Sequence, residues 1–350
     1  MKILHILYSN RFSGAENVVC QIIGMMKKVP GVEMIYCSPD GQIREALGER
    51  GIAFEPIADL CKSELRRVIA KVKPDVVHAH DMRASFVAAL ACKKIPFISH
   101  VHNNFVNARG ISPKSVAYLY AARKAKHIFW VSESAMRDYA FRKSVEKKSE
   151  VLYNIISLDA LYAKMVLDEK EYSYDVAYVG RLTEQKNPQR LMGVIAKMKA
   201  LKPDVRVAVV GNGDLEKETH ALAAEYGICD NIDFLGFQSN PLKILHSSSS
   251  MIMVSRWEGT PMCALEAMAL GVPIVSTPVD GLKVLVHQDE NGYLSDDDDE
   301  IAKKVVEIAT DKALRERLSQ DTFEKAKILN DTRAYTERLL RAYGSAKVEN

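Results

Sequence analysis

The sequence predicts an α/β protein with two doubly wound domains, in each of which helices cover a parallel sheet. Short apolar runs of strand length alternate with helix-length segments in two successive sets, which is the pattern of parallel βαβ units. The chain has 350 residues, of which 47% are hydrophobic, and this is enough for two cores. Because ligands of such folds bind beyond the carboxyl ends of the strands, we expect the active site in the cleft between the domains.

The first domain is expected over residues 1–156. We expect its strands at 2–7, 32–38, 75–78, 96–102, 128–131 and 150–153, and its helices at 17–28, 43–50, 60–73 and from 132. Gly14, in the loop after the first strand, would let the backbone approach a ligand closely, although a plain turn is the alternative interpretation. Residues 157–173 are expected to be a linker.

The second domain is expected over residues 174–331. Its strands are expected at 175–179, 206–210, 231–235, 251–254 and from 274, and its helices from 188, at 261–270 and from 301. Thr260 can cap the helix at 261–270 and Pro261 suits its first position. The acidic run at 295–300 is interpreted as a surface loop entering a helix, with a cation site as the alternative. A last helix is expected at 332–343.

Two carboxylates flank the start of the helix at 261–270. Glu258 lies in the loop before it, and Glu266 lies in its second turn. The unpaired N–H groups between them attract phosphate, whereas carboxylates repel it, so we expect the carboxylates to bind hydroxyls. A ligand with hydroxyls on both sides of a phosphate is a sugar nucleotide. The alternative interpretation is an ordinary βαβ helix with two unrelated carboxylates.

Two cations follow the first strand of the second domain. Arg181 comes directly after this strand and Lys186 lies just before the next helix, so both charges can converge at one end of the sheet. Two cations at this place suit a diphosphate leaving group. The alternative is a solvated basic loop. Gly211, after the next strand, does not begin a G-x-G-x-x-G motif, which disfavours a nicotinamide site.

Residues 258–275, E-G-T-P-M-C-A-L-E-A-M-A-L-G-V-P-I-V, closely resemble the motif of glycosyltransferase family 4, whose members are retaining enzymes of the GT-B fold. Further similarities cover nearly the whole chain: S-G-A-E at 13–16, H-A-H at 78–80, a histidine six residues after Pro96, and G-R-L-x-x-x-K at 180–186. The run N-I-I-S at 154–157 departs from the family's N-G-V-D.

The resemblance implies a role for each matching residue. Glu266 would hold the ribose hydroxyls, Glu258 the donor sugar, and Arg181 with Lys186 the leaving diphosphate. The diphosphate would lie along Gly14 and along the backbone around Gly259, Thr260, Pro261 and Met262. The base would be held by Gly211 and Phe237. His102 would approach the donor sugar, and His78 and His80 would shape the acceptor side. The last helix would pack back onto the first domain.

The implied activity is hexosyl transfer, with retention, from a nucleotide sugar (most simply a UDP-sugar) to a glycan or lipid-linked acceptor in cell-surface polysaccharide or glycolipid synthesis. No cofactor or metal is expected. Two other functions stay open: a sugar-nucleotide epimerase of similar fold, and a non-catalytic nucleotide-sugar-binding partner. His100 is an alternative to His102, and zinc held by the histidines is an alternative to a metal-free site.

The charge distribution favours an anionic partner for the first domain and gives no sign of nucleic-acid binding. Residues 1–155 hold 24 lysines and arginines against 14 acids, a net charge of +10, while the remainder holds 24 against 31, a net charge of −7. Ten of these cations and six interleaved aromatic residues lie in 109–148. Six scattered cysteines, and no signal-like or membrane-spanning run, indicate a cytoplasmic protein that could dock on a membrane. The alternative is that the cations are only solvated and the aromatics are core residues.

Overall fold

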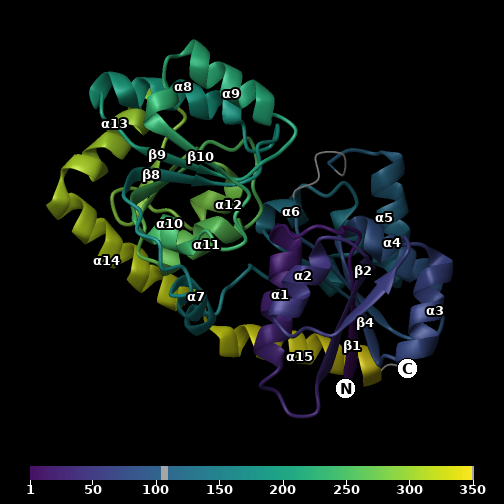
Figure 1. The fold of residues 1–350 in the computed structure, drawn as a ribbon. Helices are drawn as coiled ribbons and strands as arrows, with labels where there is room; N and C mark the ends of the chain where they lie inside the picture. The colour runs from purple at the N-terminus through teal and green to yellow at the C-terminus, as the bar shows by residue number, and fades with distance from the viewer. Residues whose placement is uncertain (104–108, 349–350) are drawn as a thin grey trace. The chain divides into compact units, whose positions relative to one another are not determined.

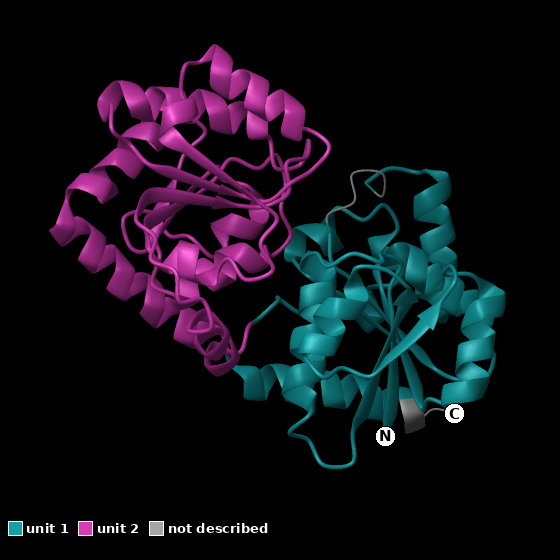
Figure 2. Cartoon of the chain, viewed as in Figure 1, with its two compact units in different colours: residues 1–155, 331–350 teal, residues 156–330 magenta. Residues whose placement is uncertain are grey.

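The computed structural model describes residues 1–103 and 109–348 and divides the chain into two compact units. Unit 1 consists of Met1–Ile155 and Asp331–Asn350, and unit 2 of Ile156–Asn330 (Figure 2). The chain therefore leaves unit 1 after its sheet and returns to it for the last helix.

Unit 1 is built on a parallel sheet of seven strands in the order β3-β2-β1-β4-β5-β6-β7. These strands are β1 Lys2–Ile6, β2 Glu33–Pro39, β3 Phe54–Ile57, β4 Val76–His80, β5 Phe97–Val101, β6 His127–Trp130 and β7 Ser149–Val151. The strand order reverses between β1 and β4: β2 and β3 extend the sheet on one side of β1, and β4 to β7 extend it on the other. Doubly wound sheets bind ligands at such a point.

Helices cover both faces of the unit 1 sheet (Figure 1). They are α1 Gly14–Met26, α2 Ile43–Glu49, α3 Lys62–Val72, α4 Asp81–Ala91, α5 Pro113–Lys124, α6 Glu133–Arg137 and α15 Thr332–Val348, with short 3₁₀ turns at Arg142–Ser144 and Glu146–Lys148. Helices α3, α4 and α5 pack side by side, and α15 packs on α1, β4 and β5. The last helix therefore completes the core of the first unit.

Unit 2 repeats this arrangement with a parallel sheet of six strands in the order β10-β9-β8-β11-β12-β13. The strands are β8 Tyr174–Val179, β9 Val207–Val210, β10 Ile232–Gly236, β11 Ser248–Met253, β12 Ile274–Ser276 and β13 Gly292–Leu294. The order reverses between β8 and β11, as it does between β1 and β4 in unit 1.

The helices of unit 2 are α7 Leu158–Met165, α8 Pro188–Leu201, α9 Glu216–Glu225, α10 Leu242–His246, α11 Met262–Ala269, α12 Asp280–Lys283, α13 Asp298–Thr310 and α14 Lys312–Leu329, with a 3₁₀ turn at Cys229–Asn231. The expected linker at 157–173 in fact holds α7, which packs on α10. Asp297 caps α13, and Arg190 and Lys197 on α8 pair with Asp298 and Asp299, so the acidic run does begin a helix.

Four of the six aromatic residues in 109–148 are core residues. Tyr118, Phe129, Trp130 and Tyr139 are each at most 1% exposed. Tyr120 remains 42% exposed, and Phe141 is partly buried against the core. Within the part of the chain that the structure describes, no helix combines the length and the apolar character that crossing a membrane requires.

Candidate active site

Backbone hydrogen bonds join the loops that follow β8, β9 and β10 in unit 2. The N–H of Gly180 donates to Val210 O at 3.0 Å, and the N–H of Gly211 donates to Gly236 O at 2.7 Å. Because the three strands are neighbours in the sheet, their carboxyl ends form one continuous rim. Arg181 lies on this rim with its side chain exposed.

Two glycines allow close backbone contacts, one on this rim and one at the loop before α11. Gly211 has φ +130°, and a Cβ there would lie 2.0 Å from Gly180 O. A Cβ on Gly281 would lie 1.4 Å from Gly259 O, which fixes the loop before α11. Both contacts are backbone to backbone, so no side-chain movement could relieve a larger residue.

A buried ion pair spans the point where the strand order of unit 2 reverses. Lys186 follows β8 and Glu258 follows β11, and Lys186 Nζ lies 2.6 Å from Glu258 Oε1. Their side chains are only 12% and 5% exposed. Burial by itself lowers the pKa of Lys186, but the Glu258 carboxylate and the nearby Cys263 and Tyr178 raise it above its usual range. Lys186 is therefore charged at neutral pH.

The backbone on both sides of this ion pair is also joined. The Gln185 side chain donates from Nε2 to Trp257 O at 3.0 Å, and the N–H of Arg256 donates to Gln185 O at 2.8 Å. The two loops are thus held together by three contacts between neighbouring residues, which limits how far Lys186 and Glu258 can separate.

Helix α11 begins one residue later than expected. Pro261 is its N-cap and the helix starts at Met262, so Thr260 lies before the cap, where it is 5% exposed. Glu266 still falls in the second turn. Cys263, in the first turn, feels Lys186 and both carboxylates: burial raises its pKa to about 11, Lys186 opposes the rise, and Glu258 and Glu266 add to it. One thiol therefore lies near three of the predicted site residues.

Phe237 follows β10 and is 56% exposed, which leaves its ring available for contact with a ligand.

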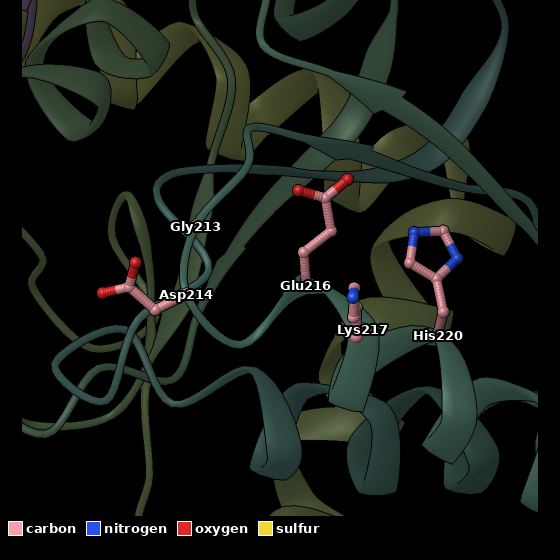
Figure 3. A pocket seen from close by; sticks show the side chains of 5 residues that line it. All are labelled: Gly213, Asp214, Glu216, Lys217 and His220. Carbon is pink, nitrogen blue, oxygen red and sulfur yellow. The ribbon is translucent and has the colours of Figure 1, made fainter.

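A separate open pocket of about 600 Å³ lies beside the β9 loop, lined by Gly213, Asp214, Glu216, Lys217 and His220 (Figure 3). His220 packs on Phe234, with ring centroids 4.0 Å apart. None of the five lining residues belongs to the predicted site.

Five histidines gather on one face of the unit 1 sheet. His5 pairs in register with His78, and His80 pairs with His100, so side chains from β1, β4 and β5 point the same way. His102 follows β5, and its Nε2 lies 2.7 Å from His80 Nδ1. All five rings are neutral at physiological pH, because burial lowers the pKa of each, to about 3 for His5 and His102.

His78 and His80 lie deeper than an acceptor-side role suggests. They are 0% and 2% exposed, and His78 Nδ1 contacts the Tyr343 hydroxyl of α15 at 2.8 Å. A contact with an acceptor stays a prediction, and their burial limits it to one made through neighbouring residues. His100 is also fully buried, whereas His102 is partly exposed.

The histidines also form the groups on which the zinc alternative rests. Among the described residues, the ring nitrogens of His5, His78 and His80, and those of His80, His100 and His102, lie within 4.8 Å of one another. Neither group includes a carboxylate that would offset a divalent charge in a dry core. Three of the rings already use nitrogens to bond one another, so a metal ion bound there would replace these hydrogen bonds.

Two carboxylates lie near the strand-order reversal of unit 1. Asp81 begins α4 with φ +70°, and its Oδ1 accepts the N–H of His102 at 2.8 Å. Burial raises the pKa of Asp81 to about 7, Glu16 adds to the rise, and the His102 N–H opposes it. Glu16 accepts a hydrogen bond from the Ser13 hydroxyl at the start of α1. This helix begins at Gly14, three residues earlier than expected, and a Cβ on Gly14 would meet open space.

Sequence reasoning missed several residues of these two sites. Cys263, Gln185 and Gly281 surround the Lys186–Glu258 pair, and Asp81 holds the His102 backbone. Asp81 directly follows the H-A-H run, and a carboxylate after a strand is a signal that could have identified it.

Two family profiles match nearly the whole chain. The profile described as "Glycosyltransferase Family 4" matches residues 12–160, and the profile described as "Glycosyl transferases group 1" matches residues 163–325. Together they cover most of each unit.

Curated relatives and solved structures agree with these matches. The chain is 23% identical, over 90% of its length and 89% of the other protein, to an Escherichia coli UDP-Gal:alpha-D-GlcNAc-diphosphoundecaprenol alpha-1,3-galactosyltransferase. It is 28% identical to an uncharacterised glycosyltransferase of Methanocaldococcus jannaschii, over 61% of the chain and 58% of that protein. The crystal structure of Anabaena HepE in complex with UDP-glucose superposes with a TM-score of 0.85 at 21% identity, over 99% of this chain and 100% of that one. The chain therefore belongs to glycosyltransferase family 4 and has the GT-B fold.

Proposed function

We propose that this glycosyltransferase moves a hexosyl group from a UDP-sugar to a glycan or lipid-linked acceptor, with retention at the anomeric carbon. The observation that carries the proposal is the buried Lys186–Glu258 pair at the strand-order reversal of unit 2. The E. coli relative that uses a UDP-sugar and a diphosphoundecaprenol-linked acceptor supports it, as does the fold shared with HepE, solved with UDP-glucose.

The proposed donor site uses charge and backbone together. Arg181 and Lys186 face the diphosphate, helped by the N–H groups at the start of α11, around Gly259 to Met262. Glu266 binds the ribose hydroxyls and Glu258 binds a hydroxyl of the sugar. In the free protein Glu258 neutralises Lys186, so an arriving diphosphate supplies the negative charge that lets Glu258 turn toward the sugar. Gly211 and Phe237 hold the base.

Front-face displacement is the proposed chemistry. The bond between the anomeric carbon and the diphosphate oxygen breaks, and the acceptor oxygen bonds to the same face of that carbon. The leaving phosphate takes the acceptor proton. Negative charge grows on the diphosphate during this step, which is where Arg181 and Lys186 contribute most. The roles that the resemblance implies for Gly14 and His102 at the donor, and for His78 and His80 on the acceptor side, stay predictions.

No metal takes part in the proposed reaction, because two cations and a helix N-terminus supply the positive charge that the diphosphate requires. Activity in excess chelator tests this. Undiminished turnover is expected. A loss of turnover that Mg²⁺ or Mn²⁺ restores would contradict the proposal and make the acidic run at Asp296–Asp299 a candidate metal site.

The proposed acceptor is brought by docking of unit 1 on an anionic membrane surface at the cytoplasmic face. Helix α5 carries the exposed Val116 and Tyr120 together with Lys114 and Arg123, and Ile111 just before it is 84% exposed. Apolar groups beside cations suit the headgroup region of an anionic bilayer.

Purified protein incubated with UDP-, GDP- and ADP-sugars, with and without lipid-linked and soluble glycan acceptors, tests the proposed function. Product is expected only with a UDP-sugar plus acceptor, and its anomeric configuration, read by NMR, should match that of the donor. Glu258→Gln should abolish product, while Glu316→Gln on the surface of α14 should not. Conversion of the donor without any acceptor would favour the epimerase, and donor binding without turnover the binding partner.

A further inference from the structure

Three of the histidines in unit 1 form one hydrogen-bonded chain. His5 Nδ1 lies 2.9 Å from His80 Nε2, and His80 Nδ1 lies 2.7 Å from His102 Nε2. The ring planes differ by only 18° and 22° in these two pairs. The rings therefore meet edge to edge, with each hydrogen bond close to the plane in which a nitrogen lone pair points.

A neutral imidazole carries one N–H and one bare nitrogen, so the chain can be ordered in only two directions. In one, His5 donates to His80 and His80 donates to His102. In the other, His102 donates to His80 and His80 donates to His5. Both directions make the same two internal hydrogen bonds, so the two ends of the chain decide between them.

The ends favour the second direction. At the first end, His5 Nε2 lies 3.4 Å from the Sδ of Met34, a thioether that can accept a hydrogen bond and never donate one. At the other end, His102 Nδ1 is buried and has no partner among the described residues. If His5 were the first donor, an N–H of His102 would be buried without an acceptor and a bare nitrogen of His5 would face sulfur. If His102 is the first donor, all three N–H groups are used.

We propose that Met34, His5 and His80 act as positioning residues that lock His102 in the Nε2–H tautomer, with Nδ1 held as a permanent hydrogen-bond acceptor. His102 then donates to the protein interior and can only accept from a substrate hydroxyl or a water. It is neither a general acid nor a cation in the catalytic pH range. The link from His102 to substrate rests on the proposed function, whereas the lock itself does not.

Nitrogen-15 NMR of histidine-labelled protein tests the lock without any measurement of activity. At pH 7, His5, His80 and His102 are expected to show a protonated Nε2 and a bare Nδ1, with signals assigned by single substitutions to phenylalanine. A protonated Nδ1 or an imidazolium on any of the three overturns the proposal. The pattern should survive excess chelator, and a change on chelation would also overturn it, because metal would then order the rings.

Met34→Leu removes the sulfur and keeps the volume, so the protein should fold. It should mix the two tautomers of all three rings, and Met198→Leu in the core of unit 2 is the matched control. An unchanged tautomer pattern in Met34→Leu would show that sulfur does not set the direction. For the substrate link, Met34→Leu should lower kcat several-fold with donor KM little changed. A tautomer shift with unchanged kcat would contradict a role for His102 at the sugar while leaving the lock standing.

Discussion

The two units share one strand order, yet each carries a different kind of chemistry where that order reverses. In unit 2, the loops after β8 and β11 bring a lysine and a glutamate into a buried ion pair. In unit 1, β1, β4 and β5 carry four neutral histidines and a fifth, His102, follows β5, while the carboxylate of Asp81 lies at the end of β4. The comparison shows that topology fixes where a site forms, while side-chain charge decides what the site can bind.

The largest expected difference between the two units is in how their stability responds to acid. The five clustered histidines of unit 1 have pKa values far below the unfolded value of about 6.5, so the unfolded state binds more protons and stability falls as pH drops from about 6.5 toward 3. Each histidine contributes up to about 1.4 kcal/mol per pH unit in that window. Asp81, with a pKa raised to about 7, acts in the opposite direction but is one group against five. The raised pKa of Lys186 matters only in strong alkali.

Hydrogen exchange of the full chain, resolved by peptide, measures this contrast. Protection of β1, β4 and β5 should fall between pH 6.5 and 4, before that of β8 and β11. Simultaneous loss in both units, or earlier loss in unit 2, would contradict the assignment of the acid response to the histidines.

The ion pair should matter to the stability of unit 2 more than a surface pair does. Glu258→Gln leaves a buried lysine without its counter-charge, and removal of one partner of a buried pair costs about 3–5 kcal/mol. Asp299→Asn is the matched control, because the Lys197–Asp299 pair is as short, at 2.5 Å, but its side chains are 39% and 77% exposed, so its loss should change stability little. Chemical denaturation compares the two variants. Equal losses would mean that the Lys186–Glu258 pair is effectively solvated.

Arg181→Ala and Lys186→Ala should reduce turnover more than donor binding. Charge grows on the diphosphate as the glycosidic bond breaks, and one lost donor to such charge typically lowers the rate on the order of 10²–10³-fold. Steady-state kinetics at saturating donor, together with calorimetric donor affinity, separate the two effects. Normal turnover in both variants would remove this pair of cations from the site.

Sequence patterns predicted the fold class, most strands and the charged residues of unit 2, because a strand followed by a polar loop is a local signal. They missed α4, whose alanine-rich sequence is buried on several faces and so shows no single apolar stripe. The contact between Lys186 and Glu258 joins residues 72 positions apart, so only the tertiary fold reveals it. His5 gave no signal, because a strand buried on both faces lacks a polar alternation against which a histidine would stand out.

Glu266→Ala should weaken nucleotide binding by ~1–3 kcal/mol if hydrogen bonds to the ribose hydroxyls are lost. Calorimetry with UDP measures this directly, and Glu316→Ala serves as a control of equal charge change on the exposed surface of α14. An affinity equal to that of the unaltered protein would exclude Glu266 from the nucleotide site and would weaken the functional contrast between the two units.

The smallest effect per residue is expected at the membrane, where each exposed cation near an anionic surface contributes ~1 kcal/mol. Sedimentation with liposomes should show binding by the full chain that rises with anionic lipid and falls with salt. Lys114→Glu, Arg123→Glu and Lys124→Glu on α5 should together abolish it, because these side chains are exposed whereas Lys126 is partly buried.

The control for this set reverses the same number of charges in unit 2, at Lys303, Lys312 and Arg317, whose side chains are 69%, 78% and 50% exposed. If membrane affinity followed net charge alone, both triple variants would lose binding equally. A loss confined to the α5 variant would assign docking to unit 1.

Val116→Ser should then reduce the salt-resistant part of the binding, since a serine buries less apolar surface than a valine. Equal recovery with neutral and anionic liposomes would contradict docking and favour a soluble acceptor.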